Sequence, residues 1–209
     1  MDKKFKTSLF IFRRDLRIED NTALIAAARE SGYLLPCFII DPRQVTTNNT
    51  YRSLNALQFM KEALIDLNEQ IHAKGGRLYI LQGTAEKIVA DIIQTVQIDA
   101  LYINRDYSPF SAHRDEELKK ICHEHNIEFI QKNDILLTEP EDIVTGNGTA
   151  YSIFTPFFKL PENTLVLITL LLPSLVIKIP FSSLGTAPAK GANPPNVLND
   201  VKSAVLSFT

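Results

Sequence analysis

Short apolar runs alternate with amphipathic segments over the first 130 or so residues of the chain. Leu9–Phe12 is an apolar run without a polar interruption, too short for a buried helix and typical of a central parallel strand covered on both faces. Similar runs predict further strands at 33–40, 77–81, 100–103 and 127–130.

Between these runs, apolar residues recur every three or four positions, which predicts helices. The first helix is expected to have Asp20 as its N-cap and Gly32 at its C′ position. The other predicted helices cover residues 53–73, 84–96 and 111–125.

Five strand–helix alternations with short connections predict an α/β fold, a Rossmann-like doubly wound five-stranded parallel sheet with helices on both faces. We assign this domain to residues 1–135, and a loop and hairpin leading to a linker to residues 136–159. Residues 160–209 form an irregular C-terminal tail, apolar at first and then rich in proline. It is a divergent linker, a disordered segment or a frameshifted end. Pro173 and Lys178 leave too short a span for a membrane helix, so no membrane partner is expected.

The composition is that of an ordinary globular protein, with 45% hydrophobic and 22% charged residues. A net charge of −2 argues against a nucleic-acid-binding surface over the whole chain. The two cysteines, Cys37 and Cys122, are expected to be buried free thiols in a reducing compartment. The N-terminus lacks a signal-peptide core, so we expect a cytoplasmic protein.

Charged and polar residues gather where predicted strands end, at the edge where open α/β sheets bind ligands. These candidate cofactor-binding residues are Arg13, Asp15, Arg17, Asp41, Arg43, Asn104, Arg105, Asp106 and Tyr107. Such a rim could hold a flat ligand, with the arginines suited to a carboxylate or phosphate. The alternative is a structural ion-pair network, in which Arg105, Asp106 and Arg114 pair with one another.

The segment FIFRRDLRIEDNTAL resembles the opening of the DNA photolyase/cryptochrome family, which typically reads W-F-R-x-D-L-R-x-x-D-N-x-A-L. Ile11 stands where the family often has Trp, and the matching positions are Phe12, Arg13, Asp15, Leu16, Arg17, Asp20, Asn21, Ala23 and Leu24. The segment 151–157, YSIFTPF, also resembles the end of that family's N-terminal domain. The resemblance covers residues 8–159 and is nearest the bacterial class I deoxyribodipyrimidine photolyases.

The resemblance implies that this chain is the light-harvesting antenna domain of a truncated photolyase. In the full-length family, cyclobutane pyrimidine dimers are repaired by light-driven electron transfer from FAD, which lies with the DNA-binding groove in a helical domain C-terminal to the part seen here. That domain is therefore the implied partner, and damaged DNA is not expected to bind this chain. We expect the chain alone not to repair DNA, and we assign no catalytic residue. The sequence also has no tryptophan, whereas the family usually reduces its flavin through tryptophans.

The family's antenna chromophore is a folate, a deazaflavin or a flavin. Folate-binding members have an Asn-Glu pair where this sequence has Phe110-Ser111, which argues against folate. A deazaflavin, a flavin or an empty site remain.

Two alternative interpretations of the chain are open. A free-standing Rossmann-like nucleotide-binding module would need a glycine-rich loop after the fourth strand, and residues 104–111 contain no glycine. A non-functional truncated product would expose apolar residues around Phe154, Phe157 and Phe158. The run 122–125, CHEH, is expected to be a solvated helix end, and no metal ligands are assigned.

Overall fold

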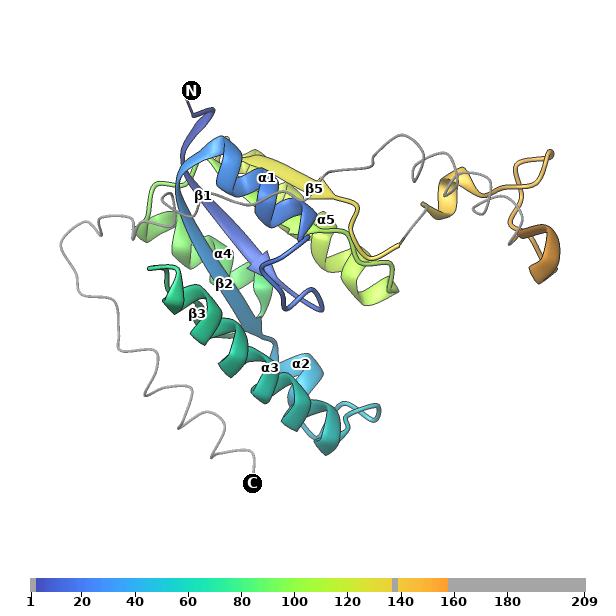
Figure 1. Ribbon diagram of the computed structural model, residues 1–209, viewed down its shortest axis with the longest axis horizontal. Helices are drawn as coiled ribbons and strands as arrows, with labels where there is room; N and C mark the ends of the chain where they lie inside the picture. The colour runs from blue at the N-terminus through green and yellow to red at the C-terminus, as the bar shows by residue number, and fades with distance from the viewer. Residues whose placement is uncertain (1–2, 137–138, 158–209) are drawn as a thin grey trace.

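The computed structural model describes residues 3–136 and 139–157, so the predicted tail at 160–209 lies outside the described residues. Its sheet confirms the predicted α/β fold: five strands, all pairing in parallel, in the order β3-β2-β1-β4-β5 (Figure 1). The strands are β1 (Phe5–Phe12), β2 (Ser31–Ile40), β3 (Tyr79–Gln82), β4 (Ala100–Asn104) and β5 (Glu128–Lys132).

Helices cover both faces of this sheet, as predicted (Figure 1). On one face α1 (Thr22–Glu30) and α3 (Leu54–Ala73) pack in one apolar cluster, and on the other α4 (Ala85–Thr95) and α5 (Pro109–Glu124) pack in a second. The structure adds a short helix, α2 (Pro42–Val45), and a 3₁₀ turn, η1 (Pro140–Asp142). None of the helices in the described part of the chain has the length and hydropathy needed to span a bilayer.

The apolar run of β1 is unbroken because its side chains feed both cores. Phe10 and Phe12 belong to the cluster under α1 and α3, with their rings edge to face at 4.7 Å. Leu9 and Ile11 belong to the cluster under α4 and α5. Successive strand residues point to opposite faces, so a strand buried on both sides needs an apolar residue at every position.

Both predicted ends of the first helix are wrong. The N-cap is Asn21, whose side chain accepts a hydrogen bond from the Leu24 N–H, while Asp20 lies in the left-handed region at φ 50°. At the other end, β2 begins at Ser31, directly after the helix, and Gly32 is a strand residue. A Cβ on Gly32 would lie 3.1 Å from the carbonyl oxygen of Lys6, so a close backbone approach accounts for this glycine better than a turn.

The strand order places a topological switch point between β1 and β4, because β2 and β3 lie on the far side of β1 while β5 lies on the far side of β4. The loops after β1, β2 and β4 therefore meet at the carboxyl edge of the sheet. Beyond β5, the predicted hairpin turn is present, with Val144 bridging Ala150 and the Thr145 N–H donating to the Thr149 carbonyl at 2.8 Å.

The two cysteines offer a direct check of this packing. Burial raises the pKa of the Cys37 thiol and of the Cys122 thiol to about 12 each, so at pH 8 neither is expected to form the reactive thiolate. We expect the native chain to resist Ellman's reagent at pH 8 and both thiols to react once guanidinium unfolds it. Asn55→Cys, at an exposed position of α3, supplies the positive control. Rapid reaction of the native wild-type chain would contradict the packing.

Candidate ligand-binding site

A buried polar network holds the centre of the carboxyl edge together. The Asp15 carboxylate accepts hydrogen bonds from the Arg13 N–H at 2.7 Å, the Asn104 amide at 2.5 Å and the Asn21 amide at 3.2 Å. Asn104 in turn accepts from the Ala23 N–H at 3.0 Å. The three side chains of Asp15, Asn21 and Asn104 belong to residues that are at most 3% exposed. Asp15 and Asn104 therefore fix the loop after β1 and the start of α1 to the end of β4.

The Arg13 side chain crosses from the β1 loop to α5. It forms a two-pronged ion pair with Asp115, at 2.5 and 2.8 Å, and its Nη1 also lies 3.3 Å from the Asn104 carbonyl oxygen. The same carboxylate accepts from Arg114 Nε at 3.3 Å and from Gln131 at 3.0 Å. One buried carboxylate is thus shared between two guanidinium groups.

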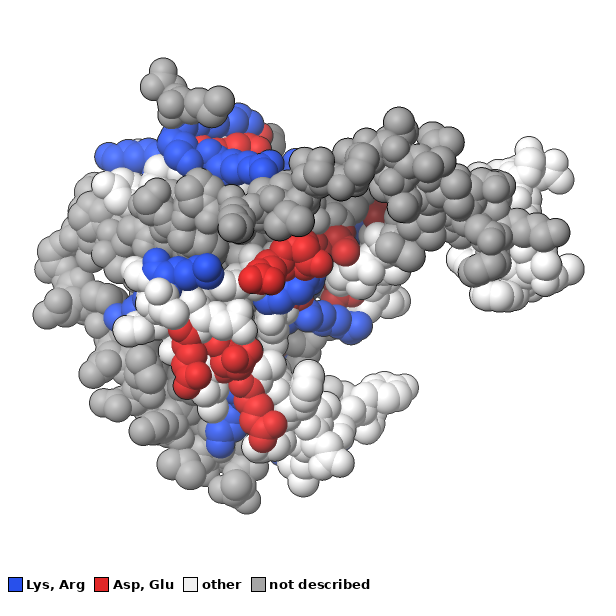
Figure 2. Space-filling view, in the orientation of Figure 1, with Lys and Arg blue, Asp and Glu red and all other residues white. Residues whose placement is uncertain are grey.

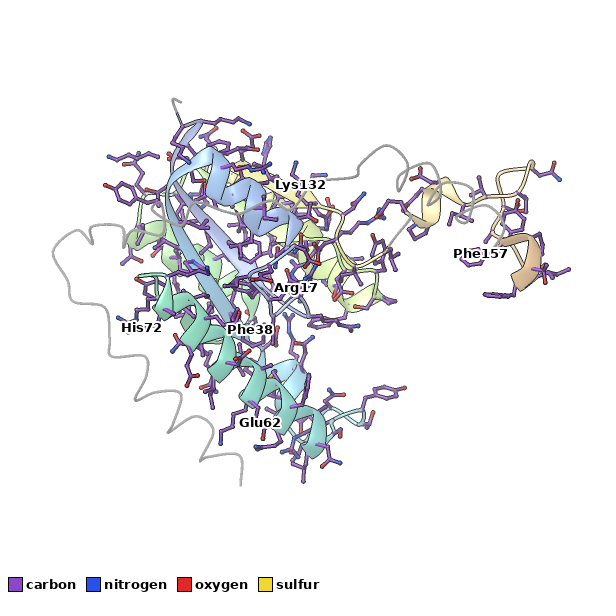
Figure 3. All side chains as sticks on the ribbon, viewed as in Figure 1. Arg17, Phe38, Glu62, His72, Lys132 and Phe157 are labelled. Carbon is purple, nitrogen blue, oxygen red and sulfur yellow. The ribbon has the colours of Figure 1, made fainter. Side chains whose placement is uncertain are left out.

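Arg17 lies in the loop after β1, and its side chain contacts the segment that follows β5 (Figure 3). It pairs with Asp20 and, at 2.8 Å, with Asp134. Asp134 also accepts from the Thr22 N–H at the start of α1, at 2.8 Å. Burial alone would lower the pKa of Arg17, and the bonds to Asp20 and Asp134 outweigh it and raise the pKa.

The remaining predicted residues form two separate groups of contacts, one around Arg43 after β2 and one around Arg105 and Tyr107 after β4. Arg43 donates to Asp41 at 2.6 Å and to Glu86 at 3.2 Å, and its guanidinium lies 5.0 Å from the centre of the Phe110 ring. On the other side of the edge, the residues after β4 contact the segment after β5. Arg105 pairs with Glu139 at 2.7 Å and with Glu141 at 2.5 Å, and the Tyr107 hydroxyl donates to Glu139 at 2.7 Å.

The alternative, in which Arg105, Asp106 and Arg114 pair with one another, is therefore wrong for Arg105, because Arg105 pairs with Glu139 and Glu141. Asp106 instead lies 3.5 Å from Arg14. Across the middle of the face in Figure 2, acidic and basic side chains lie beside one another. Much of the charged rim is thus an internal network that holds the loops.

A cavity of about 310 Å³ opens in this edge, between the ends of β1 and β2 and the helices α3 and α5. Its apolar lining residues include Phe12, Leu16, Phe38, Phe59 and Met60. Figure 3 shows Phe38 on β2, facing α3. Its charged lining residues are Arg13, Arg14, Asp41, Asp106 and Arg114. The volume is at the lower end of the range for small-molecule sites, and apolar walls with a few polar groups are their usual chemistry.

Three of the nine predicted residues, Arg13, Asp41 and Asp106, line this cavity, and the other six lie in the surrounding network. Four residues that line the cavity were not predicted from the sequence to contact a ligand: Arg14, Arg114, Phe59 and Met60. The sequence did contain a signal for Phe59, because this large aromatic residue falls outside the apolar stripe of α3. In the structure Phe59 is 72% exposed, whereas Leu64, Leu67 and Ile71 of the same helix are buried.

Asp106 is held as a carboxylate in this cavity. Burial favours its neutral form, but hydrogen bonds from the Ser108 N–H and from Ser111, with the charges of Arg14 and Arg114, more than offset burial and lower the pKa. Among the described residues, no group of three or more His, Cys, Asp or Glu side chains could hold a metal ion.

Residues 8–172 match the family described as DNA photolyase. The chain belongs to the DNA photolyase family. A deoxyribodipyrimidine photo-lyase of a Synechococcus strain is 32% identical over 151 residues, which are 72% of this chain and 31% of that protein. Cryptochrome-1 of Drosophila melanogaster is 32% identical over 143 residues, 66% of this chain and 26% of that protein. The chain thus spans about a third or less of these photolyase-family relatives.

Among solved structures, an archaeal photolyase from Sulfolobus tokodaii is 42% identical, with a TM-score of 0.69 over 75% of this chain and 35% of that one. That structure is described as containing two FAD molecules, with the implication of a novel light-harvesting cofactor. A class III photolyase from Agrobacterium tumefaciens is 29% identical with a TM-score of 0.67. Photolyases of different classes and cryptochromes therefore all match, and kinship to the bacterial class I enzymes stays a prediction.

The buried network can be tested through Asn104. Asn104→Ala removes a donor to Asp15 and Asn21 and the acceptor of the Ala23 N–H, which leaves buried polar groups without partners. We expect the free energy of unfolding in urea to fall by about 3 kcal/mol. Asn55→Ala on the exposed surface of α3 is the matched control, with an expected change within about 0.5 kcal/mol. Equal effects of the two substitutions would mean that the network does not support the edge.

Proposed function

We propose that this domain binds a flat, light-absorbing chromophore in the cavity at the carboxyl ends of β1 and β2. The observation that carries the proposal is the cavity itself, which is lined by aromatic and thioether side chains together with charged groups. It lies beside the switch point of a doubly wound sheet, where such folds bind ligands. Three predicted residues, Arg13, Asp41 and Asp106, are the candidates for contact, while the other six position the loops.

A flavin or deazaflavin ring suits this cavity better than a folate. Phe38, Phe59 and Met60 offer apolar surface to a tricyclic ring. The relative from Sulfolobus tokodaii, for which a light-harvesting role of FAD is implied, shares 42% of its aligned residues with this chain. Phe110-Ser111, in place of the Asn-Glu pair of folate-binding members, adds to the argument against folate.

Binding can be measured with riboflavin, whose fluorescence is quenched when its ring is stacked in a protein. We expect the wild-type chain to quench riboflavin fluorescence saturably and Met60→Trp to abolish this, because the larger side chain fills the cavity. Ile65→Trp is the matched control, since Ile65 is on the same helix, is 49% exposed and does not line the cavity. Binding that survives Met60→Trp undiminished would place the ring elsewhere.

We further propose that this polypeptide captures light without itself repairing DNA. The residues that match photo-lyases amount to about 31% of the length of those relatives, and they fold here as the α/β sheet domain. The resemblance assigns FAD-driven electron transfer to a different, helical domain.

A repair assay separates capture from catalysis. We expect the purified chain, supplied with reduced FAD and blue light, to leave cyclobutane dimers in an oligonucleotide intact. A photolyase that contains both domains, assayed in parallel, should repair them. Light-dependent repair by this chain alone would refute the second proposal and leave the chromophore site untouched.

A further inference from the structure

Two guanidinium nitrogens on the cavity wall are buried without a hydrogen-bond partner among the described residues: Nε of Arg13 and Nη2 of Arg114. The Arg114 side chain is only 12% exposed. A donor that has lost water and gained no acceptor costs free energy, and a charged donor costs more than a neutral one. Native proteins keep such groups rarely, and a ligand acceptor is one explanation.

The charge of Arg114 is also incompletely balanced. Within the described part of the chain its one ion pair is the 3.3 Å contact to Asp115, and that carboxylate already forms a two-pronged pair with Arg13. Two positive groups therefore share one negative group. Burial, followed by the positive charge of Arg13, lowers the pKa of Arg114 even though Asp115 and Asp106 act to raise it, so an anion placed here would gain from both guanidinium groups.

The other carboxylates on the cavity wall have partners of their own, and although the charge of Asp106 acts on Arg114, neither carboxylate accepts a hydrogen bond from Arg114 Nη2. Asp41 is bound by the Arg43 guanidinium at 2.6 and 3.0 Å. Asp106 accepts from the Ser108 N–H at 3.2 Å and lies 3.5 Å from Arg14.

We propose that Arg114 is an anion-binding residue of this cavity and that the ligand carries a phosphate ester which accepts a hydrogen bond from Arg114 Nη2. A guanidinium group suits a phosphate because its donors are coplanar and always charged. The inference deepens the proposed function and rests on it for the ring of the ligand. Of the candidate chromophores it selects a phosphorylated flavin-type nucleotide over the uncharged flavin nucleus.

The first test compares riboflavin with flavin mononucleotide, which differ by the phosphate. In the wild-type chain we expect flavin mononucleotide to bind about tenfold more tightly. Arg114→Gln should remove this preference, because it weakens binding of flavin mononucleotide more than binding of riboflavin. Lys119→Gln, an exposed position of α5, removes the same charge outside the cavity and should preserve the preference.

The second test uses inorganic phosphate alone and does not depend on the flavin. At constant ionic strength, phosphate should raise the thermal midpoint of the wild-type chain and of Lys119→Gln, but not that of Arg114→Gln. Acetate, included as a second arm, separates a phosphate site from one that accepts any small anion. A comparable rise with acetate would overturn the assignment to phosphate.

The outcomes separate the two proposals. Phosphate stabilisation that requires Arg114, with no binding of either flavin, would refute the chromophore site and support the anion-binding residue. Equal affinity for the two flavins, or a parallel loss of both in Arg114→Gln, would overturn the anion-binding role. If Arg114→Gln does not fold, Arg114→Lys takes its place: it keeps the charge without the planar fork, and an undiminished preference there would overturn a specific hydrogen bond from the guanidinium.

Discussion

The buried hydrogen bonds among Asp15, Asn21 and Asn104 are the constraint on which the carboxyl edge depends. They connect the loop after β1 and the N-cap of α1, which are neighbours in sequence, to the last residue of β4, which lies 83 residues after Asn21. A carboxylate this deep in a protein is tolerated only when its acceptor positions are filled. Backbone and amide donors fill them here, so the loop has little freedom to move.

That constraint decides what the charged loops can do. With the β1 loop held by Asp15, Arg13 is directed toward α5 and Arg17 toward the β5 side, and each meets a buried carboxylate, Asp115 or Asp134. Arg43 and Arg105 are engaged by acidic partners in the same way. The structural-network interpretation of the charged rim therefore holds for most of its residues, and the ligand-cradle interpretation stays a prediction for the few that face the cavity. The network forms the frame, and a smaller set of groups faces the cavity.

The position of the cavity follows from packing as much as from charge. Phe12 ends β1 on the face covered by α3, and the first turns of α3 bring Phe59 and Met60 over the same space. The apolar wall and the guanidinium groups of Arg13 and Arg114 thus face one volume. A planar aromatic ligand with one anionic substituent matches this mixed lining better than either a purely apolar or a purely charged ligand.

The α/β class, the five parallel strands and the membership in the photolyase family could all be predicted from the sequence, because periodicity and the motif at residues 12–24 are local properties. The sequence did not determine where α1 begins, because Asp20 and Asn21 are both good caps and the contacts of Asn21 with Asp15 and Asn104 distinguish them. Nor could it separate the residues that line the cavity from those that hold the loops. Arg114 is next to Asp115 in sequence, yet its incomplete pairing arises because Arg13, about a hundred residues earlier, takes the same carboxylate. Whether a donor has a partner depends on side chains that meet across the sheet, and these contacts exist only in the folded chain.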